Sequence, residues 1–158
     1  MTPPRPPSSA DEAHVARLQE EVSFALYVAA RALARHYRPL LTELGLTYPQ
    51  YLVMLVLWTR GPLTVKELGE TLGLDSGTLS PLLQRLADKG TVDRRRSGGD
   101  GRQVLVASTR GGDCLRDRVR VGWEAAGGTP GDSAEQYEVL VDCLLSLTGR
   151  LRGGALSG

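Results

Sequence analysis

The stretch 47–90 contains repeated helix start and stop signals, which constrain the fold more than any other feature of the sequence. Thr47 with Gln50, and Thr64 with Glu67, have the spacing of a capping box, in which each side chain hydrogen-bonds the backbone N–H of the other residue. The first pair predicts a helix that runs to about residue 59. The second pair predicts a shorter helix directly after it.

The short helix is expected to end at Gly73, and Asp75 can cap a further helix at about 76–89 that ends at Gly90. Leucines at three- and four-residue spacing give this last helix one apolar face. These leucines are Leu79, Leu82, Leu83 and Leu86. Two short helices joined by a tight turn that contains glycine form a helix-turn-helix.

Two predicted strands, 91–96 and 103–108, follow directly and enclose a glycine-rich turn at 97–101. They predict a β-hairpin with a flexible tip. A helix-turn-helix followed by such a hairpin is a winged helix. In that fold the second short helix enters the major groove of DNA, and the wing contacts the backbone or the minor groove.

Positive charge is concentrated in this part of the chain. The net charge of the 158 residues is +1, but residues 85–102 carry +3 and the remainder carries −2. Such a cluster alone is more typical of a solvated surface, whereas its position in a wing favours contact with phosphates. The candidate DNA-binding residues are Ser76, Thr78, Ser80, Gln84, Arg85, Arg94, Arg95, Arg96, Asp100 and Arg102.

The side chains in that set suit different tasks. Glutamine matches the edge of adenine and arginine that of guanine, so Gln84 and Arg85 are candidates for base recognition. The hydroxyl groups of Ser76, Thr78 and Ser80 can meet phosphates or base edges at the start of the helix. For each of these three, ordinary helix capping and surface polarity is an equally good explanation.

Helices are also expected on both sides of the winged helix. Residues 22–44 carry apolar side chains at helical spacing, and a helix at 110–126 is weakened by Gly111 and Gly112 in its first turn. A last helix from Ser133 has a broad apolar face. This face packs either on its own domain or against a second copy of the chain, and recognition of palindromic DNA favours a homodimer.

The fold class is therefore mainly α with a small β-hairpin wing. The expected organisation is a disordered Pro- and Ser-rich tail at 1–15, a helix of a dimerisation and sensing region at 16–46, a winged helix-turn-helix DNA-binding domain at 47–108, and dimerisation helices at 109–152. The longest apolar run, Leu52 to Trp58, is too short to span a membrane, and an export signal is not apparent, so a cytoplasmic protein is expected.

Catalytic, cofactor and metal functions are not expected. No nucleophile or metal motif surrounds His14 or His36, the two histidines of the sequence. The spacing of Cys114 and Cys143 matches neither a zinc site nor a disulfide scaffold. Cys143 lies on the apolar face of the last helix, so burial is expected, whereas Cys114 lies near a helix start, where the helix dipole can lower a thiol pKa.

Five segments carry a resemblance to a known family. They are Phe24-Ala25-Leu26-Tyr27, Tyr37-Arg38-Pro39-Leu40-Leu41, Leu46-Thr47-Tyr48-Pro49-Gln50-Tyr51-Leu52, Leu63-Thr64-Val65-Lys66-Glu67-Leu68-Gly69 and Leu74-Asp75-Ser76-Gly77-Thr78-Leu79. With the order of elements, they make residues 20–108 similar to the multiple-antibiotic-resistance regulators (MarR family), and specifically to the organic hydroperoxide resistance (OhrR) branch. The resemblance implies a dimeric DNA-binding repressor in the response to organic hydroperoxides.

One position departs from that branch. The resemblance implies a peroxide-sensing cysteine directly before the Phe-x-x-Tyr segment, where this chain has Ser23. A serine hydroxyl neither ionises near neutral pH nor forms a sulfenic acid, so Ser23 cannot sense peroxide. The tyrosines that the resemblance implies for the same pocket are retained as Tyr27, Tyr37 and Tyr48.

Three explanations for Ser23 remain open: a polar helix residue without a role, a cysteine replaced deliberately to hold the DNA-bound form, or a natural regulator that has lost this sensor. Such a regulator would respond to a different small molecule or use Cys114 or Cys143. A winged-helix module for protein–protein contact is a further alternative, and the basic wing argues against it.

Overall fold

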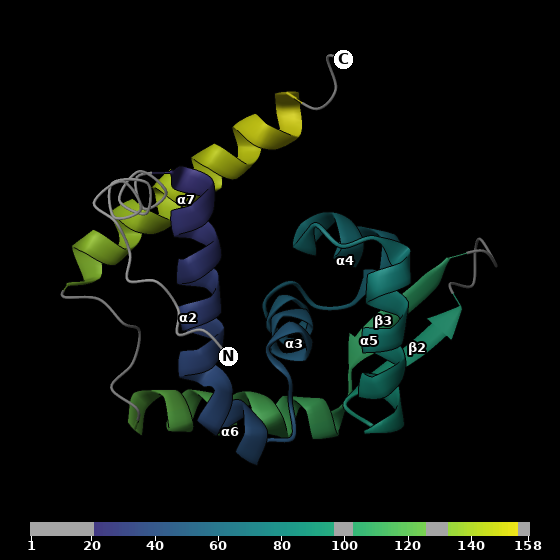
Figure 1. The fold of residues 1–158 in the computed structure, drawn as a ribbon. Helices are drawn as coiled ribbons and strands as arrows, with labels where there is room; N and C mark the ends of the chain where they lie inside the picture. Colours follow the sequence, from purple (N-terminus) through teal and green to yellow (C-terminus); the bar gives the residue numbers. More distant parts are fainter. Residues whose placement is uncertain (1–20, 97–102, 126–132, 155–158) are drawn as a thin grey trace, which may run out of the picture. The chain divides into compact units, whose positions relative to one another are not determined.

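The computed structural model describes residues 21–96, 103–125 and 133–154 (Figure 1). In chain order the elements are α2 (Val22–Glu43), α3 (Tyr48–Arg60), β1 (Leu63–Thr64), α4 (Val65–Leu72), α5 (Ser76–Asp88), β2 (Val92–Arg96), β3 (Val104–Ser108), α6 (Arg110–Ala125) and α7 (Ala134–Gly154). The mainly α fold with a small antiparallel sheet is confirmed. The expected tail at 1–15 and the hairpin tip at 97–101 lie outside the described residues.

The chain divides into two compact units, Met1–Arg120 and Val121–Gly158. The first unit contains the winged helix with α2 and most of α6. The second unit contains the end of α6 and the whole of α7. The domain boundaries expected at residues 47 and 109 stay predictions.

The predicted capping boxes are present. The Thr47 hydroxyl accepts from the Gln50 backbone N–H at 3.4 Å, and the Gln50 side chain accepts from the Thr47 N–H at 3.0 Å. Thr64 and Glu67 make the same reciprocal pair at 3.2 and 2.7 Å. Gly73 then ends α4 with a φ of +66°, in the left-handed region that glycine adopts without strain. These local signals place the helix-turn-helix where the sequence predicts it.

The sheet contains a strand that the sequence does not predict. Its order is β1-β3-β2, with both pairs antiparallel, and Leu63 in β1 lies opposite Val106 in β3. Residues 92–96 pair with 104–108 as the expected hairpin. β1 is two residues long, so it has no alternation to reveal it, and only the partner strand makes it a strand.

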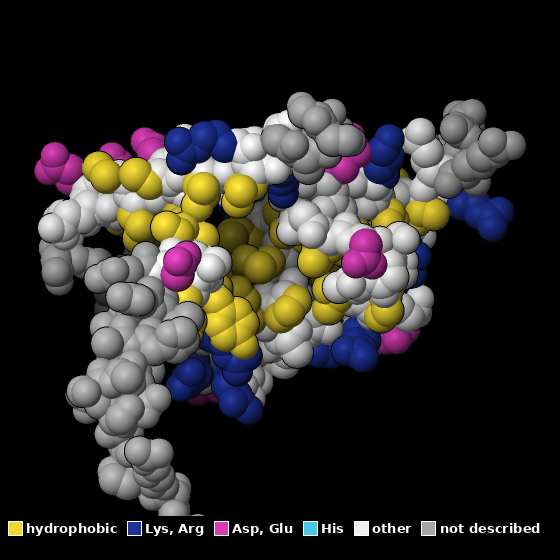
Figure 2. Space-filling model, turned by 45° about the horizontal axis from the view of Figure 1, so that its top comes forward, with side chains coloured by type: hydrophobic (Ala, Val, Ile, Leu, Met, Phe, Trp, Pro, Cys, Tyr) yellow, Lys and Arg dark blue, Asp and Glu magenta, His cyan; other side chains and the backbone are white. Residues whose placement is uncertain are grey.

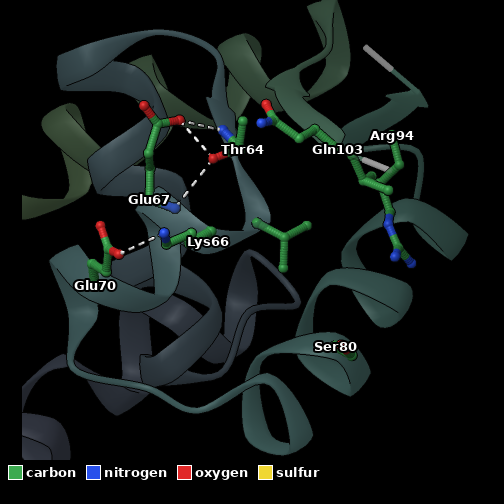
Figure 3. A pocket seen from close by; sticks show the side chains of 9 residues that line it. Thr64, Lys66, Glu67, Glu70, Ser80, Arg94 and Gln103 are labelled. Carbon is green, nitrogen blue, oxygen red and sulfur yellow. Dashed lines mark hydrogen bonds and ion pairs between the residues drawn. The ribbon is translucent and has the colours of Figure 1, made fainter. Parts of the chain in front are cut away.

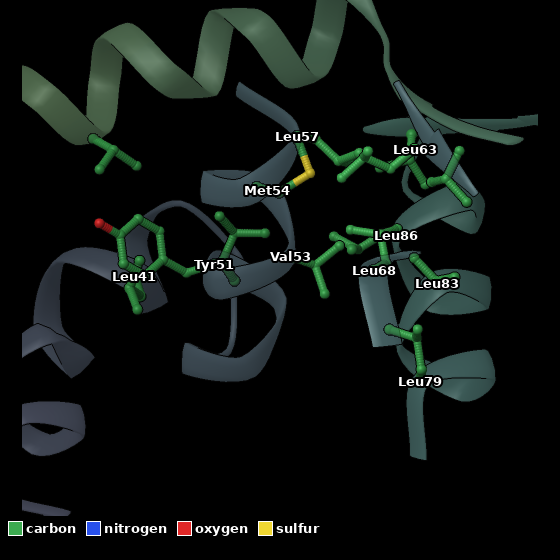
Figure 4. Packing of buried hydrophobic residues seen from close by; sticks show 14 residues of the cluster. Leu41, Tyr51, Val53, Met54, Leu57, Leu63, Leu68, Leu79, Leu83 and Leu86 are labelled. Atoms are coloured by element: carbon green, nitrogen blue, oxygen red, sulfur yellow. The ribbon is translucent and has the colours of Figure 1, made fainter. Parts of the chain in front are cut away.

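The hydrophobic core of the first unit surrounds α3. Val53 and Met54 of this helix are completely buried, and Figure 4 shows them between α2 and the leucines of α4 and α5. The predicted inward face of α5 is confirmed, with Leu79, Leu83 and Leu86 buried and Leu82 half-buried. On α3, the apolar side chain of Leu55 is 41% exposed in the single chain.

Gly112, predicted to weaken the first turn of α6, allows this turn to approach the core closely. A Cβ atom at this position would lie 2.2 Å from the Thr91 carbonyl oxygen and 2.9 Å from the Met54 side chain. The Thr109 hydroxyl accepts from the Gly112 backbone N–H at 3.1 Å and so caps the helix. The glycine therefore lets the start of α6 pack directly on the core.

Large apolar side chains remain exposed on α2 and α7. On α2 they lie near its start, and on α7 they occur along the helix; hydrophobic side chains are visible at the surface in Figure 2. The set is Val22, Phe24, Tyr27, Val28, Tyr137, Val139, Leu140, Leu144, Leu145 and Leu151. The expected burial of Cys143 is wrong for the single chain, because Cys143 and Cys114 are both exposed there.

Among the residues described, no single helix is long and apolar enough to cross a membrane. Only α2 and α3 taken together, as a pair bent by 81°, reach the required length and composition. The core residues of α3 named above are buried within the first unit.

Candidate nucleic-acid interface

Helix α5 presents its predicted hydroxyl residues to solvent. Asp75 caps the helix by accepting from the Thr78 backbone N–H at 2.8 Å, and the Thr78 hydroxyl donates to the same carboxylate at 3.1 Å. The backbone N–H and hydroxyl of Thr78 hold the pKa of Asp75 below its usual range. Ser76, Thr78 and Ser80 are all exposed. Thr78 thus takes part in capping, and the other two hydroxyls lie open on the same helix.

The rest of α5 separates a buried from an exposed side. Its leucines face the core, whereas Gln84 and Arg85 are exposed. At the end of the helix, the Lys89 ammonium group donates to the Gly45 carbonyl in the turn between α2 and α3. α5 is therefore anchored at its end and along one face, and its outer face carries polar and basic side chains.

The three predicted arginines of the wing differ in their surroundings. Arg94 in β2 is half-buried and donates from Nη1 to Oε1 of Gln84 at 3.1 Å, which links the wing to α5. Arg95 pairs with Asp93 on the same strand, and its side chain is largely exposed. Arg96 is exposed. The structure thus brings the basic strand beside the helix that the sequence predicts to enter the major groove. The other two predicted wing residues, Asp100 and Arg102, lie outside the described residues.

An open groove of about 640 Å³ lies between α4, α5 and the wing (Figure 3). Figure 3 shows Ser80 from α5, Arg94 from β2 and side chains from the first turns of α4 around it. Lys66 of α4 lines the groove and forms an ion pair with Glu70 at 3.8 Å. Gln103, directly before β3, also lines the groove. Neither Lys66 nor Gln103 was predicted to contact DNA, because only the tertiary fold brings them next to α5.

The carboxylate of Glu67 borders the same groove but serves the start of α4. The hydroxyl and the backbone N–H of Thr64 both donate to it at 2.7 Å. These hydrogen bonds hold the pKa of Glu67 below its usual range. Glu67 is therefore negatively charged near neutral pH, and the groove is lined by two carboxylates, Glu67 and Glu70, and two cationic side chains, Lys66 and Arg94.

The residues of the predicted sensing pocket form two separate groups in the chain. Tyr37 and Tyr48 pack together with ring centroids 5.5 Å apart, and Tyr51 lies against both. Ser23 and Tyr27 are exposed near the start of α2. An α-helix rises about 1.5 Å per residue, so Ser23 lies roughly 21 Å along α2 from Tyr37. A single chain does not bring the four residues into one pocket.

Arg31 was not identified from the sequence, yet it belongs to the group near the start of α2. Its Nη1 donates to the Tyr27 hydroxyl at 3.3 Å, and its guanidinium lies 5.6 Å from the centroid of that ring. The four-residue spacing of Tyr27 and Arg31 on a helix was the available signal.

In the parts of the chain that the structure describes, no cluster of His, Cys, Asp and Glu could hold a metal ion.

Comparison with known proteins agrees with this architecture. The model of the MarR family matches residues 46–104, which span α3 to the start of β3. The organic hydroperoxide resistance transcriptional regulator of Bacillus subtilis (strain 168) is 45% identical over 103 residues, which are 65% of this chain and 70% of that protein. The chain belongs to the MarR family.

Two further similar proteins cover more of the chain. The regulator TtmR of Methylorubrum extorquens (strain PA1) is 44% identical over 138 residues, which are 87% of this chain and 71% of TtmR. The crystal structure of AbfR of Staphylococcus epidermidis covers 92% of this chain and 99% of that one, with 30% identity and a TM-score of 0.76. Reduced AbfR has also been solved bound to DNA and matches with a TM-score of 0.70, 31% identity and coverage of 89% of this chain and 98% of that one. As a MarR-family protein, this chain is a DNA-binding transcriptional regulator rather than an enzyme.

Proposed function

We propose that this protein is a homodimeric repressor that binds a palindromic operator and belongs to the organic hydroperoxide branch of its family. The observation that carries the proposal is the exposed polar face of α5 beside the arginine-rich strand β2. The relationship to the B. subtilis regulator supports the branch. The proposed DNA-binding residues are Ser76, Thr78, Ser80, Gln84, Arg85, Arg94, Arg95, Arg96, Asp100 and Arg102.

A second copy of the chain is the proposed cover for the exposed apolar surfaces of α2 and α7. Isolated apolar side chains are common on protein surfaces, but a helix with many of them usually packs against a partner. Leu140, Leu144 and Leu145 of α7 are all exposed in the single chain. A homodimer buries such surfaces in both copies and presents two α5 helices to half-sites that lie about one helical turn, roughly 34 Å, apart on the duplex.

The separation of Ser23 from Tyr37 also favours a dimer. Two copies of α2 that pair antiparallel bring the start of one helix beside the end of the other. Ser23 and Tyr27 of one copy then lie near Tyr37 and Tyr48 of the second copy, so the proposed sensing pocket is completed between chains. A thiol at position 23 would be oxidised in that pocket, whereas the Ser23 hydroxyl is inert to peroxide.

The experiment that tests the proposal measures release of operator DNA by an organic hydroperoxide. We expect this chain to stay bound and Ser23→Cys to be released at micromolar oxidant, because only the variant forms a sulfenic acid at the pocket. If the hydroperoxide also released the unaltered chain from DNA, the proposal that its sensing position is inert would be wrong. The response would then be assigned to an exposed thiol. Ser substitutions at Cys114 and Cys143 identify which one, since both are exposed.

A different small-molecule inducer is the second candidate, and a hollow of about 360 Å³ between α2 and α3 favours it. Arg38, Thr42 and Tyr48 line this hollow and offer a guanidinium and two hydroxyl groups. An organic anion that lowers the affinity for DNA of this chain but not of Arg38→Met would support this candidate. Unchanged binding in the presence of such anions would argue against it.

A further inference from the structure

The side chain of Gln84 lies between an acidic residue of its own helix and an arginine of the wing. Its Nε2 donates to Oδ1 of Asp88 at 2.8 Å, one helical turn further along α5. Its Oε1 accepts from Nη1 of Arg94 at 3.1 Å. Two hydrogen bonds therefore connect Asp88 at the end of α5, through Gln84, to Arg94 in strand β2.

The partners of Gln84 fix the orientation of its amide group. The Asp88 carboxylate only accepts hydrogen bonds and the Arg94 guanidinium only donates them, so the amide of Gln84 has one orientation that satisfies both. Recognition of adenine requires Oε1 and Nε2 of a glutamine together on one base edge. In this structure those two atoms are directed to Asp88 and Arg94 instead.

The Arg94 side chain is partly buried, and one of its donors has no partner among the described residues. This donor is Nε, which is itself buried. A buried donor without a partner costs free energy, so the position of the guanidinium needs another explanation. Arg94 also lines the groove beside Ser80. Lys66 in the same groove pairs with Glu70, so within the described residues Arg94 is the groove cation without a carboxylate partner that an incoming phosphate would meet.

We propose that Gln84 is a positioning residue that fixes Arg94 against α5, and that Arg94 rather than Gln84 contacts DNA, at a phosphate. This inference rests on the proposed DNA-contacting face, and within that face it changes the role of Gln84 from a DNA contact to a support for Arg94. An unrestrained arginine loses several rotamers when it binds, and a guanidinium held in place by an amide loses fewer. Asp88 orients the amide, and Gln84 transmits that orientation to the wing.

The test compares four variants of the full chain: Gln84→Met, Arg94→Met, the double variant, and Gln84→Glu. Methionine keeps the length of both side chains and removes their hydrogen bonds. Binding is measured by fluorescence anisotropy over a range of salt concentrations. The two duplexes are one from the promoter region of the protein's own gene and an unrelated one of equal length. Base preference is measured separately by selection from a pool of random duplexes, and thermal unfolding confirms that the variants remain folded.

We expect Gln84→Met and Arg94→Met each to weaken binding to both duplexes by about tenfold. The salt slope, which is the slope of the logarithm of the binding constant against the logarithm of the salt concentration, should become less steep by about two per dimer for Arg94→Met. It should also become less steep for Gln84→Met. The double variant should be no weaker than Arg94→Met, because Gln84 acts through that residue. Gln84→Glu should bind DNA more weakly than Gln84→Met, because its carboxylate cannot donate to Asp88 and adds a negative charge beside the phosphates. The base preference of Gln84→Met should match the unaltered chain.

Arg95→Met is the matched control, since it removes the same charge from the neighbouring position, where the arginine pairs with Asp93. Its effect should add to that of Gln84→Met. A changed preference at one base pair with an unaltered salt slope would overturn the inference, and so would additivity of Gln84→Met with Arg94→Met. If the unaltered chain binds no duplex in a salt-dependent way, the proposed DNA-contacting face itself is wrong.

Discussion

The indole Nε1 of Trp58 donates a hydrogen bond to the carbonyl oxygen of Gly112 at 3.2 Å, across 54 residues of sequence. This contact joins α3, the central helix of the core, to the first turn of α6. It forms beside the point where the missing side chain of Gly112 lets the helix approach Thr91 and Met54. The attachment of α6 to the winged helix therefore depends on a residue with no side chain.

Replacement of Gly112 by alanine should destabilise the protein strongly. The new Cβ would lie 2.2 Å from the Thr91 carbonyl, so the start of α6 must shift, and overpacking of this kind typically costs about 1–3 kcal/mol. Urea unfolding measures the loss. Gly111→Ala is the matched control, since its Cβ would meet atoms no closer than 3.4 Å, and it should be neutral or slightly stabilising. Equal losses for the two variants would show that helix propensity, not packing, sets the effect.

The cap of α5 should make stability depend on acidic pH. Hydrogen bonds from Thr78 hold the pKa of Asp75 below its usual range. The unfolded chain therefore binds a proton at higher pH than the folded chain, and the contribution of Asp75 to stability is complete above the unfolded pKa and lost as the pH falls through the folded value. Thermal unfolding between about pH 5 and pH 2 should show a smaller decline for Asp75→Asn than for the unaltered chain.

Asp75→Ala separates the cap from its charge. Asparagine still accepts from the Thr78 N–H, whereas alanine leaves this N–H without the cap. Asp75→Ala should therefore be less stable than Asp75→Asn already near neutral pH. Identical pH profiles for the unaltered chain and Asp75→Asn would indicate that titration of this carboxylate does not contribute.

Dimerisation should depend on the apolar surface of α7. Leu145 is 64% exposed in the single chain, and a glutamate there would place a charge in the proposed interface. Sedimentation velocity of Leu145→Glu should shift from twice the chain mass toward the chain mass of 17.0 kDa. Ser146→Glu adds the same charge at the next position, which faces about 100° away around the helix, and this variant should stay dimeric. Sedimentation of the unaltered chain as a monomer at micromolar concentration would contradict the proposed dimer.

The wing should contribute affinity for DNA without sequence preference. Arg102→Ala removes a cation next to the predicted tip, so binding to all duplexes should weaken by a similar factor, and the salt slope should fall by about two per dimer. Anisotropy titrations at several salt concentrations measure both quantities. An affinity and a salt slope equal to those of the unaltered chain would mean that Arg102 does not touch the duplex.

Local signals were sufficient for the elements that carry the interface. Thr47, Thr64 and Asp75 start their helices as predicted, and Gly73 ends α4, because capping involves residues within four positions of each other. The alternation of the hairpin was equally visible. These features depend on neighbouring residues alone, and together they specify the winged helix.

Contacts between distant residues decided what these signals do not contain. β1 is a strand only because Leu63 meets Val106, and the glycine at 112 is needed only because α6 lies on Thr91 and Met54. Gln84 was predicted to recognise a base from its residue type and its place on a helix, yet its partners are Asp88 and Arg94. Helix caps and periodicity are encoded in neighbouring residues, whereas the partners of a side chain depend on how the whole unit packs. For that reason the sequence alone established the winged helix, and the tertiary structure decided which of its polar side chains face one another.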